Sequence, residues 1–155
     1  MKKLLILLLR KTRSSTPVSA HCDGPCGVYD PAQAQVAGEA VLAMTKKLIA
    51  LDKESTDKTD LNYLHNFTRF TSIKESEAEK AKHHLTVLWA DYFKPTHLEK
   101  YPDLHTLFWN ALKTASSCKQ EISETHANEL LDYIQQVHKI FWETKGKDVS
   151  WRETS

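Results

Sequence analysis

One imidazole, two thiols, two carboxylates and a phenol lie within residues 21–31, whose sequence is HCDGPCGVYDP. The segment directly follows Val18-Ser19-Ala20, a run of small residues that is typical of a protease cleavage site. Cleavage after Ala20 would give His21 a free α-amine beside its imidazole, within reach of both sulfur atoms. The segment therefore offers a dense set of metal ligands, on the condition that the preceding residues are removed.

The donors of this segment favour a planar metal site. The His21 amine, the deprotonated amide nitrogen of Cys22 and the Cys22 thiolate form two fused five-membered chelate rings, and the Cys26 thiolate can close the square. A planar set of nitrogen and sulfur donors suits nickel(II) or copper(II) and does not suit tetrahedral zinc. The His21 imidazole can serve as an axial fifth ligand, and electron-rich thiolates favour one-electron redox chemistry. Gly24-Pro25 lets the chain double back so that both sulfurs face one point.

The Cys-x-x-x-Cys spacing on its own leaves other structures open. Cys22 and Cys26 could form a disulfide or half of a zinc site. The third cysteine, Cys118, falls in an apolar helical pattern and is expected to be a small buried side chain without a functional role. Chemistry alone therefore leaves two hypotheses, a planar redox metal site and an N-terminal segment closed by a disulfide.

The elements that must position this segment are expected to be helices. Asp30-Pro31 is typical of a helix start, with Asp30 as the N-cap and Pro31 at the first helical position. Apolar residues recur at helical spacing along most of the chain, without a convincing strand pattern. Two predicted helices run from Pro31 to Leu51 and from Leu61 to Lys94, the second with a bend near Thr71-Ser72. After a short connection over His97–Tyr101, a third helix begins at Pro102 and includes Cys118. The fourth begins at Ser123 and stops at Gly146. We predict an all-α protein: a metal-binding hook over residues 21–30, an antiparallel four-helix bundle over 31–146 and a polar tail over 147–155.

Composition narrows the function and the location. The chain has 155 residues, which is enough for one domain, and a net charge of +1. Residues 1–20 hold five basic and no acidic side chains, so the remainder carries −4 and has no basic patch that would indicate nucleic-acid binding. The apolar run Leu4–Leu9 is shorter than an ordinary signal-peptide core and far too short to span a bilayer. We expect residues 1–20 to be a pro-peptide of a cytoplasmic protein without membrane partners, with export as the alternative.

Three sequence blocks resemble the nickel superoxide dismutase family. They are HCDGPCGVYDPA at 21–32, KHHLTVLWADYFKP at 82–95 followed by HLEKYP at 97–102, and IFWETK at 140–145. The resemblance implies one nickel ion per subunit, bound by His21 through its amine and imidazole, by Cys22 through its amide nitrogen and thiolate, and by the Cys26 thiolate. It implies an antioxidant enzyme that disproportionates superoxide to dioxygen and hydrogen peroxide through a Ni(II)/Ni(III) cycle. It also implies a homohexamer that is matured by a pro-peptide-processing protease.

The same resemblance places three side chains around the nickel. Asp23 would help to fix the loop, and the Tyr29 hydroxyl would lie near the open face, where it orders water or superoxide. Tyr92 matches another tyrosine of the family that lies close to the site. Each tyrosine could instead be a core or interface residue, and for Tyr92 spacing alone supports that alternative equally well.

Two positions depart from the family's pattern. In well-known members a glutamate on the first helix and an arginine on the second support the axial imidazole. Counting along the chain puts Ala37 and Glu77 at those positions. Our hypothesis is that Glu77 supplies, from the second helix, the carboxylate that the first helix lacks. Two other classes of function stay open at this point: a nickel or copper carrier without turnover, and a helical interaction protein whose cysteines form a disulfide.

The second sequence block also holds basic residues that could contribute to the site. Lys82 and Lys94 are candidates for attracting the superoxide anion by raising the local positive potential. His83 and His84 are adjacent on a predicted helix and point about 100° apart, so they are poorly placed to chelate one ion. Both histidines are expected at the surface or in an interface.

Overall fold

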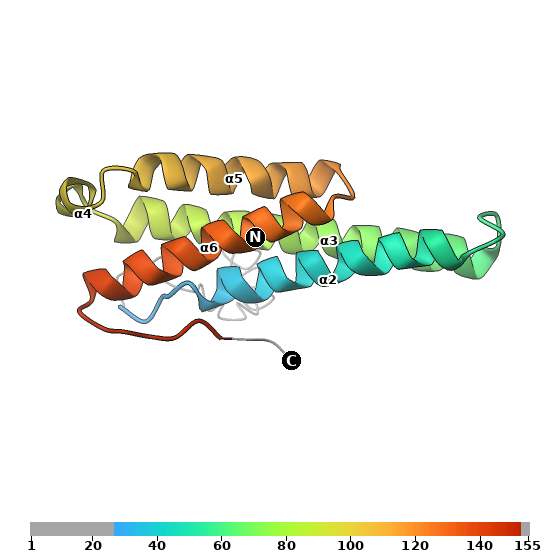
Figure 1. The fold of residues 1–155 in the computed structure, drawn as a ribbon, viewed down its shortest axis with the longest axis horizontal. Helices are drawn as coiled ribbons and strands as arrows, with labels where there is room; N and C mark the ends of the chain where they lie inside the picture. Colours follow the sequence, from blue (N-terminus) through green and yellow to red (C-terminus); the bar gives the residue numbers. More distant parts are fainter. Residues whose placement is uncertain (1–26, 153–155) are drawn as a thin grey trace, which may run out of the picture.

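The computed structural model describes residues 27–152, which form helices and the loops between them (Figure 1). The elements are α2 (Ala32–Glu54), α3 (Leu61–Val87), the π-helical turn η1 (Leu88–Tyr92), α4 (Pro95–Lys100), α5 (Leu104–Gln120) and α6 (Glu124–Thr144). No strand occurs in this part of the chain, which confirms the predicted all-α class. None of the helices between residues 27 and 152 combines the length and the apolar character that crossing a membrane requires.

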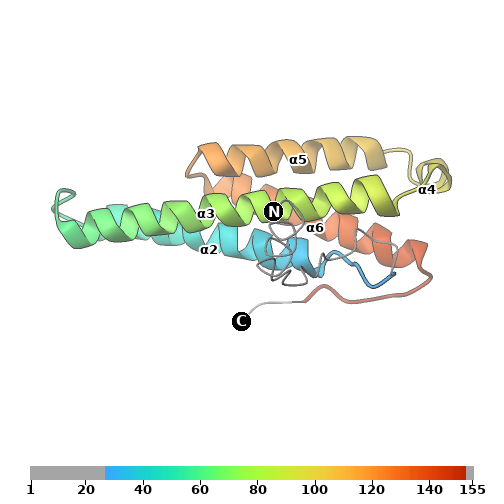
Figure 2. The same cartoon turned by 180° about the vertical axis from the view of Figure 1, so that it is seen from behind.

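The four long helices form a closed ring of neighbours. Helix α2 packs against α3, α3 against α5, α5 against α6, and α6 against α2. The two opposite views show that each neighbour runs antiparallel to the next, and that the paired ends of α2 and α3 extend beyond α5 and α6 (Figures 1 and 2). The predicted antiparallel four-helix bundle is therefore confirmed.

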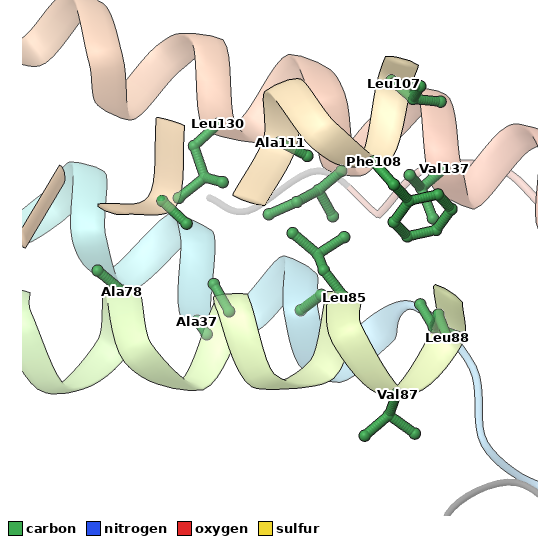
Figure 3. Close-up of a cluster of buried hydrophobic side chains, with 14 of the residues drawn as sticks. Ala37, Ala78, Leu85, Val87, Leu88, Leu107, Phe108, Ala111, Leu130 and Val137 are labelled. Atoms are coloured by element: carbon green, nitrogen blue, oxygen red, sulfur yellow. The ribbon is translucent and has the colours of Figure 1, made fainter. Parts of the chain in front are cut away.

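The core combines small side chains on α2 and α3 with larger ones from α5 and α6. Leu85, Phe108 and Val137 approach one another from three helices (Figure 3). A Cβ on Gly38 of α2 would lie 2.8 Å from the Cδ1 atom of Ile134 on α6, so a larger residue here would require the Ile134 side chain to shift. Four alanines of α2 and α3 are buried in the core as well: Ala34, Ala37, Ala78 and Ala81.

Helix α3 and its continuation differ from the prediction in two details. The predicted long helix is α3 followed by η1, in which the Phe93 N–H donates to the Leu88 carbonyl at 3.1 Å, the wider spacing of a π turn. The bend expected near Thr71-Ser72 does not interrupt α3. The connection predicted over His97–Tyr101 does link the two long helices, but most of it belongs to the short helix α4, which Pro95 opens at its first position.

The ends of the bundle follow the local sequence closely. The Asp30 carboxylate accepts the Ala32 N–H at 2.9 Å, although the cap residue of α2 is Pro31, one position later than predicted. Gly146 has a φ of 66° and ends α6, as predicted. The tail beyond it is docked through Trp151, whose ring centroid lies 5.4 Å from that of His138.

The end of α5 is closed by a buried lysine from α3. The Lys74 ammonium donates to the carbonyls of Cys118, Lys119 and Glu121, so it satisfies the carbonyls that the helix end leaves without partners. Its side chain is 1% exposed, and this burial lowers the pKa of Lys74. Cys118 is 2% exposed, and burial raises the pKa of its thiol to about 11, so it is a neutral core residue, as expected.

The four residues that carry most of the predicted metal chemistry lie outside the described part of the chain. These are His21, Cys22, Asp23 and Cys26, together with the predicted pro-peptide over residues 1–20. The described residues begin directly after Cys26, at Gly27.

Candidate metal centre

The segment 27–31 joins the predicted ligands to the bundle. It leads from Gly27, which has a φ of 71°, to the start of α2. Tyr29 is 7% exposed and belongs to the hydrophobic core, and Pro31 is buried as well. The segment is therefore fixed to the bundle within five residues of Cys26, which limits where the predicted ligands can lie.

Tyr29 is held by a histidine of α3. Its hydroxyl shares a hydrogen bond with the Nδ1 atom of His84, and the two ring centroids are 5.9 Å apart. His84 is half-buried and also lines a hollow at the surface, and His83 is exposed, as expected from the sequence. The sequence offered a signal for this inward contact of His84. The residue lies beside Leu85 and three residues after Ala81, at the edge of the stripe of buried residues on α3.

A hollow of about 360 Å³ opens beside His84. Residues of α2 and α3 line it: Ala32, Gln33, Val36, Ala37, Glu77, Lys80 and His84. Both departures from the family's pattern, Ala37 and Glu77, thus lie on one hollow next to the Tyr29 partner. Glu77 forms an ion pair of 2.6 Å with Lys80, and its side chain is only 19% exposed.

Tyr92 is positioned by the π turn at the end of α3. Its ring centroid lies 4.4 Å from that of Phe141 on α6, and its hydroxyl is 2.6 Å from the Oγ1 atom of Thr144. The single hydroxyl hydrogen of Thr144 is donated to the Phe141 carbonyl at 2.6 Å. Tyr92 must therefore donate its own hydrogen to Thr144, which leaves the Tyr92 oxygen as an acceptor for any further contact.

Lys145, directly after α6, connects the two regions that hold the predicted tyrosines. Its ammonium donates to the Gly27 carbonyl at 3.3 Å and lies 5.4 Å from the ring centroid of Tyr92. The lysines singled out from the sequence have other surroundings. Lys82 donates to Ser116 on α5 at 3.0 Å, and Lys94 is an exposed residue that precedes α4. Lys145 was not singled out from the sequence, although it belongs to the IFWETK block.

The described residues do not include the ligands predicted from the sequence. Between residues 27 and 152, no group of three or more His, Cys, Asp or Glu side chains could hold a metal ion. The amine, imidazole, amide and two thiolates of residues 21–26 fit a nickel ion by the chemistry of the donor set. Charges of both signs lie near the segment. Lys145 contacts Gly27, at the start of the segment, and the ion pair of Glu77 and Lys80 lines the hollow beside His84.

Comparisons with known proteins show which family the chain belongs to. A family model described as nickel-containing superoxide dismutase matches residues 16–145. The superoxide dismutase [Ni] of Streptomyces seoulensis is 50% identical over 139 residues, which cover 90% of this chain and 98% of the relative. That of Streptomyces coelicolor is 49% identical over the same shares of both chains.

Solved structures of nickel superoxide dismutases are about as similar in sequence to this chain as the two Streptomyces relatives are. A crystal structure of a Ni-containing superoxide dismutase, with nickel ligation corresponding to the oxidised state, has a TM-score of 0.71 and 51% identity. The native structure of a nickel superoxide dismutase has a TM-score of 0.70 and 50% identity. In both comparisons the match covers 82% of this chain and 100% of the other.

Proposed function

Because the chain belongs to the nickel-containing superoxide dismutase family, we propose that residues 21–26 hold its nickel ion, one per subunit. The chain is a nickel-dependent superoxide dismutase, which disproportionates superoxide to dioxygen and hydrogen peroxide. The ligands in this proposal are the amine and imidazole of His21, the amide nitrogen and thiolate of Cys22, and the thiolate of Cys26. The observation that carries it is the anchoring of Tyr29, three residues after Cys26, in the bundle through His84.

The donor set explains why nickel is the metal. Nickel supplies one-electron redox chemistry, which two thiolates bring into a reachable range of potential. The His21 amine and imidazole, the Cys22 amide nitrogen and both thiolates would hold the nickel. The fixed segment from Gly27 to Pro31 supports this placement, because it limits the positions open to Cys26.

The residues around the ligands orient substrate and protons. In this proposal Asp23 fixes the loop, and the hydroxyl of Tyr29 orders water or superoxide at the open face. Tyr92 lies across the same region, with its hydrogen donated to Thr144, and accepts hydrogen bonds from water or from the peroxide product. The reaction class runs near the diffusional limit, so access and proton supply matter more than binding energy.

One experiment separates this function from its alternatives. Purified protein is analysed for nickel and copper, for superoxide disproportionation and by electron paramagnetic resonance. The proposal predicts one nickel per subunit, turnover, and a rhombic Ni(III) signal that is split by an axial nitrogen. Bound metal without redox cycling would identify a carrier, and a metal-free protein with a Cys22–Cys26 disulfide would identify an interaction protein.

Replacing Glu77 with glutamine tests the support of the axial imidazole. We expect turnover per nickel to fall about tenfold, in the range seen when partners that orient metal ligands are lost, and the nitrogen splitting of the Ni(III) signal to change. The reason is that Glu77 is the carboxylate on the hollow beside Ala37, where the first helix has none. Stopped-flow kinetics and paramagnetic resonance measure both effects.

The matched control for Glu77 is Glu79→Gln on the same helix. Glu79 forms an exposed ion pair with Lys119 on α5, away from the hollow, so its loss should leave turnover unchanged. A Glu77→Gln protein with the parent's turnover and the parent's Ni(III) signal would show that the carboxylate does not support His21.

Assembly, maturation and location complete the proposal. We propose a homohexamer, which the exposed side chain of Trp109 supports, since it is 58% exposed and offers an apolar contact. A dedicated protease cuts after Ala20, and the protein works in the cytoplasm. The short apolar run in residues 1–20 supports a pro-peptide over an export signal.

A further inference from the structure

The segment that follows α6 lies beyond the part of the chain that the family model matches. That match ends at residue 145, whereas the described chain continues to Arg152. Gly146, with its positive φ, reverses the chain, and the Lys147 N–H donates to the Trp142 carbonyl at 2.9 Å. Residues 147–152, here called the strap, then run back along α6 and reach the start of α2 (Figures 1 and 2). The strap therefore connects two helices that lie far apart in the sequence.

One end of the strap is bound to α6 by a buried histidine. The Nε2 atom of His138 donates to the Val149 carbonyl at 2.9 Å, because a carbonyl oxygen can only accept. The ring of Trp151 lies at 89° to the same imidazole, with the two centroids 5.4 Å apart, and it packs against the hydrophobic core. An aromatic anchor and a hydrogen bond thus fix the strap along α6.

The other end of the strap is bound to the first two turns of α2. The Gln35 side-chain amide is buried, and it donates to the Arg152 carbonyl at 2.6 Å and to the Glu39 carboxylate at 2.7 Å. The Arg152 guanidinium donates to the second oxygen of Glu39 at 3.0 Å. Among the ion pairs within residues 27–152, Glu39 has this one alone, and its side chain is only 18% exposed. Release of the strap would therefore remove the cation of a mostly buried carboxylate and one acceptor of a buried amide.

The start of α2 is also the place where the predicted nickel ligands join the bundle. The Gln35 N–H donates to the Pro31 carbonyl at 3.0 Å, so Gln35 lies one turn after the segment 27–31. That segment directly follows Cys26, and Tyr29 fixes it to α3 through His84. The strap thus fixes to α6 the same end of α2 that Tyr29 fixes to α3.

We infer that the strap, through Trp151 and Arg152, positions the start of α2 and thereby slows the release of nickel from the hook. The inference rests on the proposed placement of nickel at residues 21–26. Local opening of a helix end costs less free energy than global unfolding, and the strap raises that cost at the end from which the hook extends. Trp151 and Arg152 are positioning residues, which act on the metal site through α2.

The first test measures amide hydrogen exchange in the nickel-free, processed protein. Loss of one such contact in Trp151→Ala or Arg152→Ala is expected to raise the opening equilibrium of residues 32–40 about tenfold. Exchange in α5, which is diagonally opposite α2 in the ring of helices, should stay as in the parent. Val149→Ala is the matched control within the strap, because Val149 binds through its carbonyl and its side chain is 39% exposed. This control should exchange as the parent does.

The second test measures how fast the nickel-loaded proteins lose their metal to an excess of chelator. We expect Trp151→Ala and Arg152→Ala to release nickel about tenfold faster than the parent, in proportion to the opening of α2. Val149→Ala should release it at the parent rate. The conservative variants Trp151→Phe and Arg152→Lys, which keep a ring and a charge, should retain nickel longer than the alanine variants.

Two results would overturn the inference. One is exchange over residues 32–40 that is unchanged in both alanine variants, which would show that the strap does not position α2. The other is faster exchange together with the parent's rate of nickel release, which would show that the start of α2 does not control the hook. Failure of the nickel placement itself would appear separately, as absent nickel in the parent protein.

Discussion

Replacement of Cys26 with serine is expected to abolish both nickel binding and superoxide disproportionation. A serine hydroxyl stays protonated at neutral pH, so the site loses one of two thiolates and one corner of its plane. The loss should exceed the ~10–100-fold that removal of an outer partner of a metal ligand costs, because a ligand itself is removed. Nickel content, measured by mass spectrometry of the metal, and a superoxide assay give the two results.

Cys118→Ser is the matched control for this variant. Cys118 is buried between α5 and its neighbours, and burial raises the pKa of its thiol to about 11, so it does not offer a thiolate at neutral pH. The control should bind nickel and turn over superoxide as the parent does, even where its stability is lower. A Cys26→Ser protein that keeps full nickel content and activity would rule out the proposed ligand set.

Retention of a single residue before His21 is expected to have an effect of similar size. A chain that begins at Ala20 carries an amide at the His21 nitrogen, and an acylated nitrogen is a poor ligand. The free amine, with an ordinary pKa near 7.7–8.0, gives up its proton to a metal at little cost. We expect the extended protein to lose the Ni(III) signal and nearly all turnover.

The comparison protein for this experiment begins at His21 and differs by that one residue alone. Both proteins should unfold at the same temperature before nickel is added, because the bundle begins at Ala32. Equal activity of the two loaded proteins would show that the amine is not a ligand, while the thiolate ligands could still be correct.

The fold was predictable from the sequence because its signals are local or periodic. Asp30-Pro31 marks the start of α2 and Gly146 the end of α6, and the apolar periodicity between them defines four helices. The π turn was not predictable in the same way. Its extra residue per turn is selected by the packing of Tyr92 against α6, a contact between residues far apart in the chain.

The surroundings of the site were only partly predictable for the same reason. Tyr29 and Tyr92 came from the resemblance, and Ala37 and Glu77 were identified as departures that the structure then places on one hollow. His84 and Lys145 act through tertiary contacts with Tyr29 and Gly27, and no local pattern indicates such contacts. Many helices have a histidine beside a buried stripe or a lysine at their end without any functional site nearby, so these patterns alone do not identify a site residue.

Nickel binding through a free His21 amine together with two thiolates is the central proposal for this protein. It is tested most directly by determining the N-terminal residue of the active protein from its native source, together with its nickel content. Intact mass and N-terminal sequencing should give a chain that starts at His21 with one nickel per subunit. A fully active chain that still starts at Met1 would contradict the proposal.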